Sequence, residues 1–157
     1  MMARGPTLLA AYLAGDPAAN EAVREAMADW LTGESDSPAS LLARLGLPGT
    51  RRSNALALRD AALVAAAVVA DRAVPASRRS TYARAKRLQT ACRLFAAHPW
   101  PAWQRLPAAP AHANALESVL FTAFKRHAAA YRDGSTPGEW SLSQFRALVQ
   151  DLAQKSA

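Results

Sequence analysis

Six basic residues form the densest group of side chains in the sequence that could bind a ligand. They are Arg78, Arg79, Arg84, Lys86, Arg87 and Arg93. Three of them, Arg79, Lys86 and Arg93, recur every seven residues, which places them along one flank of a helix over about 21 Å at 1.5 Å per residue. Positive side chains in such a row bind phosphate groups by displacing condensed counterions. The spacing therefore predicts a surface that binds an anionic partner.

The distribution of charge supports this prediction. The 157-residue chain has a formal net charge of +7, and residues 1–40 carry six acidic and two basic residues. Residues 41–132 carry fifteen basic and three acidic residues, and no acidic residue occurs between Asp71 and Glu117. An exposed helix face usually mixes signs, because opposite charges three or four residues apart stabilise the helix. A basic face without acids therefore favours a partner over simple solvation.

Two kinds of partner are compatible with this surface. The first is nucleic acid, with DNA preferred, bound through its phosphates with little reading of base sequence. The second is an acidic protein surface, such as the acidic N-terminal helix of a second copy, which would make a homo-oligomer. An intramolecular partner, such as the acidic first helix of the same chain, and simple solvation are the remaining interpretations. We expect nucleic-acid binding, with a protein-interaction or structural role as the alternative.

Residues that could support catalysis or bind a metal are not grouped in the sequence. His98, His112 and His127 lie far apart, with no carboxylate or thiol at ligand spacing from them. Cys92 falls on the inward side of its helix, where a thiol is unreactive. No glycine-rich phosphate loop and no serine nucleophile elbow occurs. The sequence therefore predicts a non-enzymatic protein with no cofactor or metal site, in which His127 belongs to the core.

The basic residues are expected to lie on a helix that packs against a central apolar helix. Residues 51–72 predict that central helix, because its middle is apolar on all sides, with Val64 and Val68 in the core. Pro75 ends it, and Ser77 is expected to cap the basic helix that follows. The inward side of the basic helix is predicted to carry Tyr82, Ala85, Leu88, Cys92 and Phe95.

Local signals place the other helices. Helix starts are predicted at Asp16 before Pro17, and at capping boxes formed by Asn114 with Glu117 and by Ser141 with Gln144. Trp140 and Phe145 occupy the two positions of a hydrophobic staple for the last helix. Trp100 and Trp103, in a proline-rich corner, are expected to cover a helix end in preference to stacking on unpaired bases.

These signals predict an all-α protein, a single-domain irregular bundle of about five to seven helices. Strands are not expected, because β-branched and aromatic residues are sparse. The domain spans residues 1–157, with acidic N-terminal helices at 6–45, a basic core at 51–132 and a capped C-terminal helix at 141–154. A helix-turn-helix around residues 46–50 is disfavoured against a plain helical hairpin, because Arg52 would occupy a buried position of that motif.

One block of the sequence comprises residues 82–88, Phe95, residues 100–103, Leu106, Leu116 and residues 120–121. This block resembles small uncharacterised helical proteins of bacterial genomes and their prophages. The resemblance implies a bacterial, mobile-element context and assigns no role to any residue.

Cysteine usage and hydropathy predict the compartment. Cys92 is the only cysteine, so no disulfide framework exists. The longest uncharged apolar run, residues 61–70, spans ten residues and is too short for a bilayer. We therefore expect a cytoplasmic protein that does not associate with a membrane.

Overall fold

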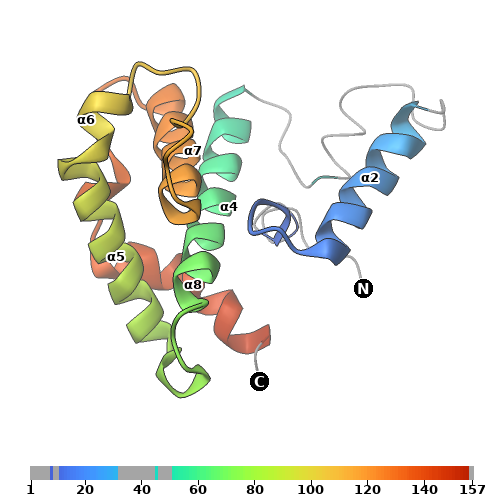
Figure 1. Cartoon of the computed structure of the whole chain (residues 1–157), viewed down its shortest axis with the longest axis horizontal. Coiled ribbons are helices and arrows are strands. Elements are labelled where there is room, and N and C mark those ends of the chain that lie inside the picture. Colours follow the sequence, from blue (N-terminus) through green and yellow to red (C-terminus); the bar gives the residue numbers. More distant parts are fainter. Residues whose placement is uncertain (1–7, 9–10, 32–44, 46–50, 156–157) are drawn as a thin grey trace.

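The computed structural model describes residue 8, residues 11–31, residue 45 and residues 51–155, and in this part of the chain the protein is all-α, as predicted (Figure 1). The helices are α2 (Pro17–Leu31), α4 (Arg51–Asp71), α5 (Thr81–Ala97), α6 (Pro99–Trp103), α7 (Ala115–Ala130) and α8 (Leu142–Lys155), with short 3₁₀ turns η1 (Ala76–Arg78) and η2 (Pro137–Glu139). No strand occurs among these residues. The predicted short helix before residue 45 and the turn at 46–50 lie outside the described residues.

Helix α4 lies in the core, as predicted, but it shares the centre of the bundle with α5, which contacts α4, α6, α7, α8 and η2. Helix α4 packs most extensively along α7 and also contacts α5 and α8. Ala62 and Ala66 are fully buried in the main core, whereas Ala61 and Ala65 are buried against Ala14 of the N-terminal segment. Alanine on both sides lets neighbouring helices approach closely, because the separation of two helix axes depends on side-chain size at the contact. In Figure 1, α2 lies to one side of the bundle, beyond α4.

The expectation that Val64 and Val68 lie in the core is wrong in detail. Both valines are half-buried and border the smaller cluster around Ala14. The fully buried positions of α4 are taken by Leu63 and by alanines that face the main core or Ala14. By length and composition alone, α4 is the one helix among the described residues that could cross a membrane.

An aromatic cluster completes the main core and includes the tryptophan corner. Phe124 meets Phe95 and Trp100 edge to face, at ring-centroid distances of 4.9 and 5.3 Å. Trp100 is 8% exposed, and Trp103 packs against the same cluster. Such edge-to-face pairs add to the stabilisation from burial itself. The preference for tryptophans that cover a helix end is therefore confirmed for Trp100.

The start of α5 differs from the prediction. Residues after Pro75 form the η1 turn, so the helix begins later, and Ser80 is its cap, with Oγ accepting from the Ala83 N–H at 3.2 Å. Ser77 lies inside η1 and does not cap α5. Tyr82 is 55% exposed and does not point inward as predicted, since it lies in the first turn of α5.

The other predicted helix starts are confirmed. Asp16 Oδ1 accepts from the Ala18 N–H at 2.8 Å at the start of α2. The two capping boxes are present, because in each the side chain of the cap and that of the residue three positions later bond to one another's backbone. The staple of α8 also forms, with Trp140 and Phe145 rings 5.5 Å apart.

Candidate anion-binding surface on α5

The six basic residues predicted to bind an anion divide into an exposed and an internal set. The exposed side chains are those of Arg78, Lys86 and Arg93. Arg79 and Arg87 are half-buried, and Arg84 is buried. The predicted positive surface is therefore narrower than the sequence suggested.

Arg84 and Arg87 share one carboxylate, that of Asp71 at the end of α4. Arg84 Nε lies 2.6 Å from Asp71 Oδ2, and Arg87 Nη2 lies 2.7 Å from Asp71 Oδ1. The side chains of Arg84 and Asp71 are only 7% and 8% exposed. Charge-assisted bonds of this kind are the strong ones in proteins. The assignment of Arg84 to a binding surface is therefore wrong, since its guanidinium joins two helices inside the protein.

Two further arginine bonds fix the turn between α4 and α5. Arg79 Nε donates to the Val74 carbonyl oxygen at 2.8 Å, and Arg87 Nη1 donates to the Arg78 carbonyl oxygen at 3.0 Å. These bonds satisfy backbone oxygens that a turn leaves without helical partners. The turn is thereby held in one shape, which sets the direction in which Arg78 leaves the protein.

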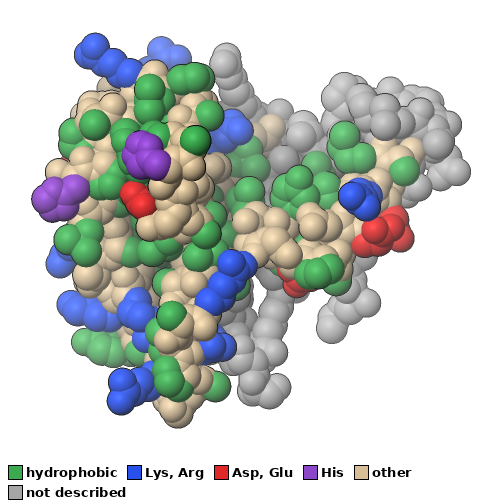
Figure 2. All heavy atoms as spheres, viewed as in Figure 1, with side chains coloured by type: hydrophobic (Ala, Val, Ile, Leu, Met, Phe, Trp, Pro, Cys, Tyr) green, Lys and Arg blue, Asp and Glu red, His purple; other side chains and the backbone are tan. Residues whose placement is uncertain are grey.

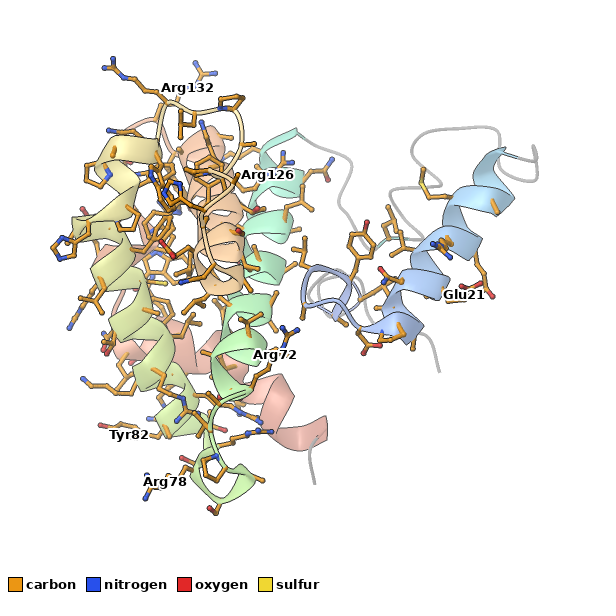
Figure 3. The ribbon with its side chains drawn as sticks, viewed as in Figure 1. Glu21, Arg72, Arg78, Tyr82, Arg126 and Arg132 are labelled. Atoms are coloured by element: carbon orange, nitrogen blue, oxygen red, sulfur yellow. The ribbon has the colours of Figure 1, made fainter. Side chains whose placement is uncertain are left out.

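The exposed cations remain available to a partner. Among the described residues, no carboxylate lies within ion-pair distance of Arg78, Lys86 or Arg93. Figure 2 shows lysine and arginine side chains gathered at the lower end of the bundle, over the start of α5. Arg78 projects from this end together with Tyr82 (Figure 3). A cation next to an exposed aromatic ring can contact both a phosphate and an unpaired base.

A second basic group lies at the opposite end of the bundle, and the six-residue set did not include it. Arg126 and Arg132 are exposed and lie at the upper end in Figure 3. Lys125 is half-buried and donates to the Gln104 carbonyl oxygen at 2.7 Å. The acid-poor composition of residues 41–132 was the signal that could have identified this group. The positive charge is therefore not confined to α5 and the turn before it.

His127 connects α4, α7 and the loop that follows α7. Arg59 Nη1 lies 3.3 Å from His127 Nδ1, and His127 Nε2 lies 3.0 Å from Ser135 Oγ. A guanidinium only donates, so Nδ1 must accept and the ring proton is on Nε2. Burial, and then the positive charge of Arg59, lower the pKa of His127. The prediction of a core histidine with satisfied hydrogen bonds is confirmed.

The same residues resemble a Ser–His–Asp constellation in composition but not in order. Ser135 Oγ donates to Asp133 Oδ1 at 2.6 Å, and this bond and the Ser135 N–H lower the pKa of Asp133. In a nucleophilic triad the carboxylate must lie on histidine Nδ1, where it stabilises the imidazolium. Here Arg59 occupies that position and opposes an imidazolium. The cluster is therefore structural.

The remaining candidates for chemistry carry none. Burial raises the pKa of the Cys92 thiol to about 12, so the thiolate nucleophile is not formed near neutral pH. No group of three potential metal ligands occurs among the described residues. Comparison of the chain with protein-family models, curated proteins and solved structures found no match.

Proposed function

We propose that the protein binds nucleic acid, with DNA preferred, through phosphate contacts from the exposed cations of α5 and the turn before it. The observation that carries the proposal is the exposure of Arg78, Lys86 and Arg93 without a carboxylate partner among the described residues. Residues 51–155 include sixteen basic and six acidic residues. Their net positive charge attracts an anionic partner such as nucleic acid. The resemblance to small helical proteins of bacterial genomes and their prophages supports a mobile-element context, and the single cysteine, Cys92, supports a cytoplasmic location.

The narrower surface sets the expected salt dependence. With Arg84 and Arg87 engaged by Asp71, about three phosphates are neutralised, which gives a log–log slope of affinity against salt near −2.7 on duplex DNA. Contacts of this kind position a ligand without reading its sequence, so only a modest sequence preference is expected.

The test is a binding titration against duplex DNA, single-stranded DNA and RNA at several salt concentrations. The double variant Lys86→Gln/Arg93→Gln should weaken binding to all sequences and make the slope shallower by about 2. Arg126→Gln/Arg132→Gln is the matched control, because it removes the same charge from α7 and the residues after it and leaves α5 unchanged. Absence of binding to every nucleic acid at low salt would refute the proposal. If the two double variants lost equal affinity for nucleic acid, binding would depend on the net charge of the protein and not on the cations of α5.

A second candidate function is binding of an acidic protein surface, including α2 of a second copy. Glu21 and Glu25 are exposed on α2 and stand four residues apart, so they present two like charges on one side of that helix. Sedimentation velocity at low and high salt distinguishes the two functions. Salt-sensitive self-association that Glu21→Gln/Glu25→Gln abolishes, without nucleic-acid binding, would favour this candidate.

A further inference from the structure

An open groove runs along the other side of α5, where the first two turns of α7 and the end of α4 meet it. Its volume is about 620 Å³, within the range of ligand sites. Most of its walls are apolar, and they are formed by Ala70, Ala91, Leu94, Phe95, Leu116 and Leu120. Leu94 is 57% exposed, although leucine is a residue type that is most often buried. The groove thus offers a continuous apolar surface to a ligand.

The charge at one end of the groove is positive. Lys86 and Arg87 line that end, and no described carboxylate lies within ion-pair distance of Lys86. Arg87 shares Asp71 with Arg84, so these three residues and Lys86 together carry a formal charge of +2. An anionic group is therefore attracted to this end.

The one acid on the groove wall does not cancel this charge. Glu117 Oε1 accepts from the Asn114 N–H at 3.3 Å, within the capping box of α7. Its charge therefore lies against the positive N-terminus of its own helix, which compensates it. The opposite end of the groove is formed by His98 and Pro99. Positive charge is thus concentrated at the end formed by Lys86 and Arg87.

We propose that this groove binds a single-chain anionic amphiphile, a long-chain carboxylate. Its chain lies on the apolar walls, and its carboxylate lies at Lys86. From Lys86 to His98 the helix rises about 18 Å, which accommodates an extended chain of about a dozen carbons. The site goes beyond nucleic-acid binding, because its apolar walls lie on the side of α5 away from Arg93. Lys86 is common to both surfaces, so bound carboxylate lowers affinity for phosphates.

Isothermal titration calorimetry of the full chain tests the site with dodecanoate below its micelle concentration. Dodecanoate should bind one to one, and dodecyltrimethylammonium should bind at least about tenfold more weakly, because the cations repel it. Decanoate should bind more weakly than dodecanoate, by about fourfold for each methylene no longer buried. No binding of dodecanoate, or equal binding of the carboxylate and the ammonium amphiphile, would overturn the proposal.

Two variants separate this site from the nucleic-acid surface. Leu94→Asn should weaken dodecanoate at least about tenfold and leave nucleic-acid binding unchanged, because Leu94 is an exposed apolar wall. Arg93→Gln should weaken nucleic acid and leave dodecanoate within about twofold, because Arg93 does not line the groove. Lys86→Gln should weaken both ligands. If Leu94→Asn instead converted a dimer to a monomer, the groove would be an interface between copies and the proposal would fail.

Discussion

Removing the charge of Asp71 should destabilise the protein far more than removing the charge of an exposed carboxylate. Asp71→Asn keeps the size of the side chain but leaves Arg84, 7% exposed, without a carboxylate. Arg84 Nη1 and Arg87 Nε already lack hydrogen-bond partners, so the cluster has no other means of compensation. Breaking a buried ion pair costs about 3–5 kcal/mol, and the more exposed Arg87 bond adds less than about 1 kcal/mol. The expected loss is about 3–5 kcal/mol of unfolding free energy, or about 10–20 °C in thermal midpoint.

Urea unfolding followed by far-UV circular dichroism measures this loss. Asp60→Asn is the comparison on the same helix, because Arg59 is 11% exposed but keeps His127 Nδ1 and the Trp140 ring as partners when Asp60 loses its charge. It should therefore cost clearly less than Asp71→Asn. The apolar replacement Asp71→Leu/Arg84→Met should recover most of the stability, since it removes both buried charges together. A loss below about 1 kcal/mol for Asp71→Asn, or equal losses at the two aspartates, would refute this reasoning.

Three further predictions concern the core, the helix start and pH. Ala66→Asp should lower the unfolding free energy by several kcal/mol or prevent folding, because Ala66 is fully buried. Val68→Asp should give a soluble, cooperatively unfolding protein, because Val68 is half-buried. Thermal melts in which the two variants behave alike would contradict this. In urea unfolding, Ser80→Ala should lower the unfolding free energy by about 1 kcal/mol and Ser77→Ala by less than about 0.5 kcal/mol. A larger loss for Ser77→Ala would mean that Ser77 caps α5. His127 has a lowered folded-state pKa, so the unfolded chain binds the proton more tightly; stability should be full above about pH 6.5 and fall as pH decreases toward the folded-state pKa. Unfolding at several pH values should show a weaker dependence for His127→Gln, and an unchanged dependence would assign the effect to other groups.

Features that depend on neighbouring residues could be predicted from the sequence. The capping box of Asn114 and Glu117 closes over three residues, so the residue types alone specify it. The start of α5 could not be fixed in the same way, because both Ser77 and Ser80 are acceptable caps. The choice depends on whether the residues after Pro75 form a 3₁₀ turn, and that is decided by the arginine bonds to the turn.

Features that depend on distant residues were not predictable. Arg84 and Arg93 look equivalent in the sequence, but only Arg84 faces a carboxylate, on a different helix. The rule for charge pairs within one helix cannot identify such a partner. Likewise Val68 is more hydrophobic than Ala66, but Ala66 faces the main core and Val68 borders the smaller cluster around Ala14. Hydrophobicity alone does not record how much space a neighbouring helix leaves.

The arginine cluster at Asp71 also bears on the order in which the chain folds. Its bonds join residues 13 and 16 positions apart, whereas the Arg59–His127 contact between α4 and α7 joins residues 68 positions apart. Closing a short loop loses less entropy, so local contacts form early. The hairpin of α4 and α5 is therefore the expected nucleus, and α7 docks onto it afterwards. Substitutions at Asp71 should then slow refolding, whereas those at His127 should mainly speed unfolding.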